Sequence, residues 1–128
     1  MSQIAKQFSI FLTNKPGELR KLLLKVKKLN LIAAASFATR DGAIMRIVPQ
    51  DSGSFKNLMK QNNINFSMQN VLLAEIDNKP GGLASTLTKL QKSHINIEGM
   101  YIVGNPSGNS ASCVIQAEDV KAAKAAIT

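Results

Sequence analysis

The sequence predicts an α+β fold made of two tandem copies of one small unit, each with an antiparallel sheet and helices packed on one face. The hexapeptide NKPGEL at positions 14–19 returns 64 positions later as NKPGGL at 78–83. An alternating apolar run precedes each hexapeptide, and a leucine-rich helical stripe follows each one at the same offset. A turn, a strand pattern and a helix pattern in a common register indicate an internal duplication. We expect one unit at residues 1–69 and the other at residues 70–128.

The first unit follows the order strand, helix, strand, strand, helix, strand. Phe8, Ile10 and Leu12 alternate with other residues, as in a half-buried strand. Asp41-Gly42 between two apolar runs predicts a hairpin. Pro16 suits the first position of a helix, and an asparagine before it suits the cap. The expected strands are 6–12, 31–39, 43–48 and 64–69, and the expected helices are 16–29 and 52–62.

The second unit repeats this order but is predicted to be one strand short. Its expected strands are 71–76, 95–103 and 110–117, and its expected helices are 80–93 and a last one that starts at 118–119. A loop at 104–109 joins two of the strands. No counterpart of strand 64–69 follows the final helix before Thr128. We therefore expect the sheet edge at that place to be open, or completed by another strand, as pairing across a dimer would do.

Composition excludes several classes of function. No apolar run reaches the ~18 residues of a membrane span, and the N-terminus lacks the apolar segment of a secretory signal. The single cysteine, Cys113, lies in an apolar run and cannot form an internal disulfide, which favours a reducing cytoplasm. His94 is the single histidine and fits an exposed turn. One Cys and one His cannot supply the four ligands of a zinc site, and the sequence shows no catalytic triad or phosphate-binding loop. We therefore expect no enzyme activity, no bound metal and no cofactor.

Positive charge is concentrated in the first unit. Residues 1–69 hold eleven Lys and Arg against three Asp and Glu, a balance of +8, whereas residues 70–128 are balanced. Lys21, Lys25 and Lys28 form a stripe opposite the leucines of the first helix. The stripe fits a solvated helix face, and it also fits a nucleic-acid-binding surface. Against nucleic acid, the central hairpin strands 43–48 and 110–117 contain no aromatic residue on which bases would stack.

The repeated strand–Asn-Lys-Pro-Gly–helix element is the part of the chain with a ligand-binding mechanism. A helix N-terminus presents N–H groups without helical partners and a partial positive charge, which suit a carboxylate or phosphate. An asparagine side chain offers both a donor and an acceptor, which suit the carboxylate and ammonium of an amino acid. The same residues also suit a plain helix start with an asparagine cap. Both readings remain open at this point.

At these residues the chain resembles the ACT domain, a small amino-acid-binding regulatory module. The resemblance rests on DNKPGGL at 77–83 and HINIE at 94–98, and it covers nearly the whole chain as a tandem pair. It implies ferredoxin-like βαββαβ units, pairing into a wider sheet as a homodimer, and an amino acid bound at an interface by the first loop and a polar residue on the second strand. The ligand-binding residues that it implies are Asn78, Lys79, Pro80, Gly81, Gly82, Leu83 and Asn96.

The first unit matches this pattern less completely. The position equivalent to Asn96 is Ile32, whose apolar side chain cannot hold an ammonium or a carboxylate. A secondary ligand loop would consist of Asn14, Lys15, Pro16 and Gly17. The resemblance implies a ligand sensor of amino-acid metabolism that regulates an enzyme in trans or through its own association. A nucleic-acid-binding module and a structural scaffold without a ligand remain as alternatives.

Overall fold

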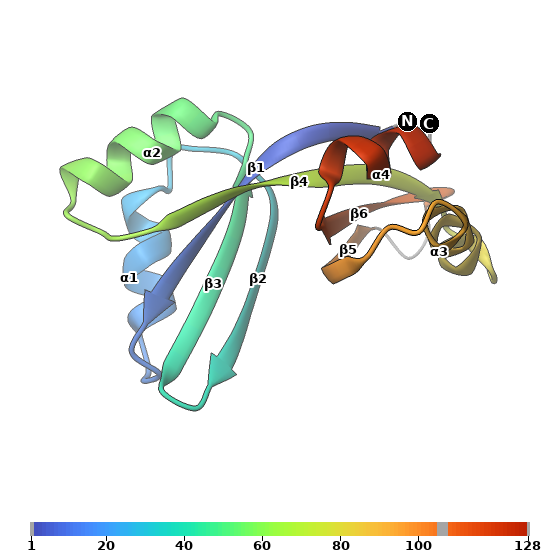
Figure 1. The fold of residues 1–128 in the computed structure, drawn as a ribbon. Coiled ribbons are helices and arrows are strands. Elements are labelled where there is room, and N and C mark those ends of the chain that lie inside the picture. Colours follow the sequence, from blue (N-terminus) through green and yellow to red (C-terminus); the bar gives the residue numbers. More distant parts are fainter. Residues whose placement is uncertain (1, 105–107, 128) are drawn as a thin grey trace. The chain divides into compact units, whose positions relative to one another are not determined.

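The computed structural model describes residues 2–104 and 108–127 (Figure 1). Part of the predicted loop 104–109 therefore lies outside the described residues. The elements up to the middle of the chain are β1 (Ser2–Leu12), α1 (Glu18–Lys25), β2 (Leu31–Thr39), β3 (Gly42–Pro49), α2 (Ser52–Gln61) and β4 (Ser67–Asp77). They are followed by α3 (Gly82–Lys92), β5 (Ile97–Gly104), β6 (Ser110–Ala117) and α4 (Val120–Ile127).

The chain divides into two compact units. Lys6–Gln69 form the first unit, and Asn70–Thr128 together with Met1–Ala5 form the second. The strands β1 and β4 are neighbours in the sheet, and each contributes residues to both units. The division predicted from the sequence, 1–69 and 70–128, differs from this one in the first five residues.

The chain's own N-terminal segment lies at the place where the sequence predicts a missing strand in the second unit. The strand β1 begins at Ser2, although the sequence suggested a start near Lys6. Ser2 and Gln3 line a hollow together with Leu73, Ala74 and Glu75 of β4, so the segment lies beside that strand. Completion of the sheet by another strand is thus confirmed. The expectation that an edge stays open there is wrong, because β1 is long enough to reach it.

The first unit packs two helices on one face of its strands. β3 pairs antiparallel with both β1 and β2, so Phe8 lies opposite Ile47. Phe8 is fully buried and contacts the rings of Phe55 and Phe66, with centroids 4.7 and 5.4 Å apart. Alternation along β1 puts Phe8 and its apolar partners toward the helices and turns Phe11 to the opposite face.

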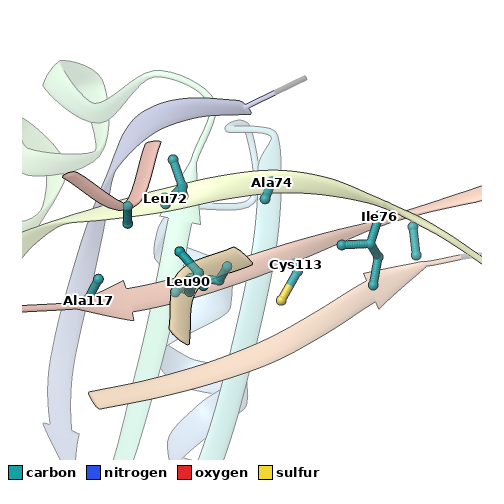
Figure 2. Packing of buried hydrophobic residues seen from close by; sticks show 9 residues of the cluster. Leu72, Ala74, Ile76, Leu90, Cys113 and Ala117 are labelled. Atoms are coloured by element: carbon teal, nitrogen blue, oxygen red, sulfur yellow. The ribbon is translucent and has the colours of Figure 1, made fainter. Parts of the chain in front are cut away.

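The second unit repeats this arrangement with smaller side chains. β6 pairs antiparallel with β4 and β5, so Ala74 lies opposite Cys113. Leu72, Ala74 and Ile76 follow one another along β4 and belong to one buried cluster with Leu90 and Cys113 (Figure 2). Burial raises the pKa of the Cys113 thiol to about 11, so it packs as a small apolar group, as the sequence predicted.

The order and type of the predicted elements are confirmed, and several boundaries differ. The strands expected at 64–69 and 71–76 are one continuous strand, β4, since no turn interrupts the extended backbone between them. The helix expected to reach Leu29 ends at Lys25, after which the N–H of Leu29 donates to the carbonyl of Val26 at 2.9 Å in a turn. This turn brings the chain to the start of β2.

Candidate functional site

The Asn-Lys-Pro-Gly sequence forms the same turn in both units. Gly81 has φ 84° and ψ −7°, and the N–H of Gly82 donates to the carbonyl of Lys79 at 3.0 Å. These values define a type II turn, in which proline precedes a glycine with positive φ. In the first unit Gly17 has φ 89° and ψ −10°, and the equivalent hydrogen bond measures 3.4 Å. The third residue of this turn has a left-handed backbone conformation, which explains why both copies have glycine at that position.

Both helices begin after this turn, with glycine at the N-cap. The expectation that Pro16 starts the first helix behind an asparagine cap is wrong, because the proline belongs to the turn. α1 starts at Glu18 and α3 at Gly82, and their N-cap residues are Gly17 and Gly81. A glycine cap has no side chain to satisfy the N–H groups of the first turn. These groups and the helix dipole therefore remain suited to an anion.

Gly82 lets α3 approach the end of β4 more closely than any other residue would allow. A Cβ at this position would lie 2.0 Å from the carbonyl oxygen of Asp77. The first unit has Glu18 at the equivalent position, so its helix must start farther from the strand. The two loops therefore differ in geometry at the helix start, because one hexapeptide has Glu18 where the other has Gly82.

Asn78 connects the β4–α3 loop to the loop between β5 and β6. Its side-chain Nδ2 donates to the carbonyl of Gly108 at 2.7 Å. Its backbone N–H donates to the carbonyl of Asn109 at 3.0 Å. Asn78 thus joins the two loops by hydrogen bonds from both its side chain and its backbone.

Lys79 and Asp77 place one cation and one anion at the rim of the site. Lys79 Nζ lies 3.8 Å from Asp77 Oδ2, and the two side chains are 69% and 72% exposed. Such an exposed pair contributes at most about 1 kcal/mol. Either group can therefore exchange its partner for an ionic group of a ligand at little cost.

These residues surround a hollow of about 350 Å³ in the second unit. Its lining consists of Ile76, Asp77, Asn78, Lys79, Pro80, Leu83, Ile102 and Ala111. Four of the predicted ligand-binding residues are among them. Gly81 and Gly82 shape the turn and the close approach of the helix. The volume is at the lower end of the range for small-molecule sites, which begins near ~300 Å³.

Asn96 lies apart from this hollow. It precedes β5 and is exposed, and it lines a second hollow with Leu87, Gln91 and His94. Its carbonyl accepts a hydrogen bond from the N–H of Glu118 at 3.2 Å. The described part of a single chain thus gives Asn78 and Asn96 separate surroundings.

The secondary loop of the first unit is exposed throughout. Asn14, Lys15, Pro16 and Gly17 follow β1 in the same type II turn. The N–H of Lys15 donates to the carbonyl of Thr13 at 3.0 Å. Thr13 stands where the second unit has Asp77, so this loop lacks the acidic group of the pair described above.

His94 and the acidic residues form no metal centre in the described ranges 2–104 and 108–127, where no group of three or more His, Cys, Asp or Glu could hold an ion. His94 follows the C-cap of α3 with φ 55°, and its N–H donates to the carbonyl of Gln91 at 2.9 Å, which agrees with a turn residue. Among the helices described, none combines the length and the apolar character that crossing a bilayer needs.

Comparison with known families decides what the duplicated unit is. A family model described as an ACT domain pair matches residues 3–128. The chain belongs to the ACT domain family. The βαββαβ order read from the sequence and the antiparallel sheets with helices on one face are those of tandem ferredoxin-like ACT units, so the predicted resemblance and fold are confirmed.

Solved structures support this assignment. A protein from Bacteroides thetaiotaomicron is 30% identical, with a TM-score of 0.88, and the match covers 98% of this chain and 87% of that one. The regulatory subunit of aspartate kinase from Thermus thermophilus is 16% identical, with a TM-score of 0.69, over 99% and 93% of the chains. The corresponding subunit from Thermus flavus is 13% identical, with a TM-score of 0.63 and the same coverage. The search of curated proteins gave no match.

Membership of the ACT family supports a regulatory role based on binding a small molecule. Of the residues that line the hollow, sequence comparison of the two units could have added Asp77, which differs from Thr13. Ile76, Ile102 and Ala111 come from strands and carried no signal, since apolar residues in strands usually belong to a core.

Proposed function

We propose that this ACT protein binds an amino acid or a similar small carboxylate at the β4–α3 loop of its second unit. The observation that carries the proposal is the hollow of about 350 Å³ bordered by Asn78, Lys79 and Pro80 at the start of α3. The ligand carboxylate would pair with the Lys79 ammonium and accept hydrogen bonds from the N–H groups at the start of α3, which has no side-chain cap. Catalysis is not part of the proposal, because ACT domains are regulatory modules.

The regulatory effect would follow from a shift in association. A ligand favours one assembly only if it binds that assembly more tightly than the other. Residues contributed by a second copy, such as Asn96, would supply this difference in affinity. We therefore propose a homodimer whose arrangement depends on the ligand and which acts on an enzyme of amino-acid metabolism in trans.

A titration of the full chain with each of the twenty amino acids tests the proposal. A binding amino acid at about 100 times its Kd should stabilise the protein by roughly 2.7 kcal/mol, measurable as a rise in Tm. Asn78→Ala should weaken binding about tenfold, because the Gly108 contact that holds the loop is lost. Asn14→Ala, the matched change 64 positions earlier, should leave binding unchanged.

Outcomes of this experiment separate a sensor from a scaffold. If Asn78→Ala and Asn96→Ala remain folded but lose the ligand, the sensor is supported. If no amino acid produces heat or changes the oligomeric state, the proposal is wrong. If both variants only reduce folding stability, a scaffold without a ligand is the better account.

A second candidate function rests on the first unit. Phe11 on β1 and Phe37 on β2 are each paired with Ile44 of β3, so the three form one row across the sheet. The two phenylalanines are 74% and 45% exposed, and the guanidinium carbon of Arg46 lies 5.2 Å from the ring centroid of Phe37. Exposed rings on a sheet face of a basic unit suit single-stranded nucleic acid.

The aromatic row corrects one step of the sequence argument. The central hairpin strands 43–48 and 110–117 contain no aromatic residue, but the flanking strands β1 and β2 carry the exposed rings of Phe11 and Phe37. Anisotropy titration with a labelled oligouridine tests this candidate. Binding that weakens steeply with salt and is lost in Phe11→Ala and Phe37→Ala would support it. Weak binding, or binding that is unchanged in Phe11→Ala and Phe37→Ala, would exclude this candidate function.

A further inference from the structure

Five of the eight residues that line the second-unit hollow are apolar. Ile76 on β4 and Ala111 on β6 are buried at its base, and Leu83 on α3 is partly buried beside them. Ile102 on β5 completes the wall and is 50% exposed. Four apolar side chains from four different elements thus face one space. An isoleucine left half exposed in this way can gain contact area when the space is filled.

The rim of the same hollow carries opposite charges. The ammonium of Lys79 and the carboxylate of Asp77 lie 3.8 Å apart at the end of β4. An α-amino acid carries a carboxylate and an ammonium at a similarly short separation. Lys79 can receive the first and Asp77 the second, so that the side chain of the ligand is directed to the apolar wall.

The first unit differs from this arrangement at one position of each half. Ile102 pairs with Cys113, which pairs with Ala74 on β4. Ser36 pairs with Met45, which pairs with Ile10 on β1, and Ile10 is the counterpart of Ala74 at the offset of 64. Ser36 therefore takes the place of Ile102.

Thr13 likewise takes the place of Asp77 in the first unit. Only the second unit therefore has isoleucine at the exposed wall position and an acidic group at the rim.

From these observations we infer that the ligand is an α-amino acid with an apolar side chain, such as leucine, isoleucine, valine, methionine or phenylalanine. This inference rests on the proposed function and adds the class of side chain. A hydroxyl, amide or charged group placed against Ile76, Leu83, Ile102 and Ala111 would lose part of its hydration and find no hydrogen-bond partner among these side chains. The hollow of about 350 Å³ has room for side chains of this size.

Calorimetric titration of the full chain with matched ligands tests the inference. Leucine and phenylalanine should bind at least about tenfold more tightly than serine, asparagine, aspartate or lysine, because differences of a few carbon atoms give such ratios in apolar sites. 4-Methylpentanoate, which is leucine without its amino group, should bind about tenfold more weakly than leucine. In Asp77→Asn, the ratio of the Kd of 4-methylpentanoate to the Kd of leucine should be smaller than in the wild type.

Ile102→Ser, which installs the residue of the first unit, provides the decisive variant. Affinity for leucine should fall about tenfold, while affinity for serine should hardly change. Leu24→Ser is the matched control, since Leu24 is 46% exposed on α1 and lies outside the hollow. It should alter neither affinity.

Two results would overturn the inference in different ways. If amino acids bind but polar ones bind as tightly as apolar ones, or Ile102→Ser weakens all ligands equally, the inference is wrong and the proposed function stands. If no amino acid binds at all, the proposed function is wrong and the inference with it.

Discussion

Single residues decide how the two copies differ, and Gly82 shows this most clearly. Its backbone approaches the carbonyl of Asp77 so closely that a methyl group has no space. Gly81, in contrast, has open space around it but a φ of 84°, which restricts it to glycine for a conformational reason. The first constraint is steric and belongs to the second unit alone. The second is shared with Gly17.

Gly82→Ala should destabilise the second unit by about 2–3 kcal/mol, because the added methyl group forces α3 away from β4. Urea unfolding measures this change. Gly53→Ala in α2 is the control, since its Cβ would make an ordinary contact of 3.6 Å with Asp51 Oδ1. It should be neutral or stabilise by about 0.5–1 kcal/mol. Equal effects of the two changes would contradict the steric account.

At the scale of elements, the helices start in two different ways. α1 and α3 begin with a glycine after a type II turn, whereas α2 begins with Asp51 as a side-chain cap. Asp51 Oδ1 accepts the N–H of Ser54 at 3.0 Å, and Oδ2 accepts the Ser54 hydroxyl at 2.7 Å. The two starts without a side-chain cap are those of the repeated motif.

The cap of α2 should make stability depend on pH. The backbone N–H of Ser54, then its hydroxyl, lowers the pKa of Asp51 from the ordinary 3.8. A lowered pKa in the folded state gives stability that is present above pH 3.8 and is lost as the pH falls through the lower folded value. The stability difference between wild type and Asp51→Ala should therefore narrow below pH 3.8 in urea unfolding. A difference that stays constant there would contradict the assignment, and Asp41→Ala serves as the control.

Repetition and periodicity were enough to predict most elements, because turns such as Asp41-Gly42 and the apolar alternation of Phe8, Ile10 and Leu12 are local signals. The cap of α1 was mispredicted because Pro-Gly fits both a helix start and a type II turn. The residues Ile102 and Ala111 of the hollow could not be predicted. They line the hollow because the strand register brings distant positions together, and the local sequence pattern does not reveal that register.

On the scale of the whole molecule, the two units share strands. The segment 2–5 of β1 lies beside β4 of the second unit, although it precedes the first unit in the chain. The second unit is therefore built from two separate segments, whereas the first is the continuous segment Lys6–Gln69. The local patterns of the sequence could not show this, since the partner of segment 2–5 lies about 70 residues away.

Deletion of residues 2–5 should raise the rate of hydrogen exchange in β4 at residues 72–76, because that strand loses a neighbour. The amides of β3, which lies between β1 and β2, should keep their protection. Gln3→Ala, with the segment retained, should change neither strand. Unchanged exchange in β4 after the deletion would contradict the assignment of segment 2–5 to the second unit.

The central claim is that the duplicated loop binds a ligand in the second unit and not in the first. Lys79 and Lys15 occupy the same place in the repeated hexapeptide, so their alanine variants form a matched pair. The most direct measurement is the Kd of the tightest-binding amino acid for the wild type, Lys79→Ala and Lys15→Ala. The account predicts at least about tenfold weaker binding in Lys79→Ala and no change in Lys15→Ala. Equal losses in the two variants, or a loss in Lys15→Ala alone, would contradict it.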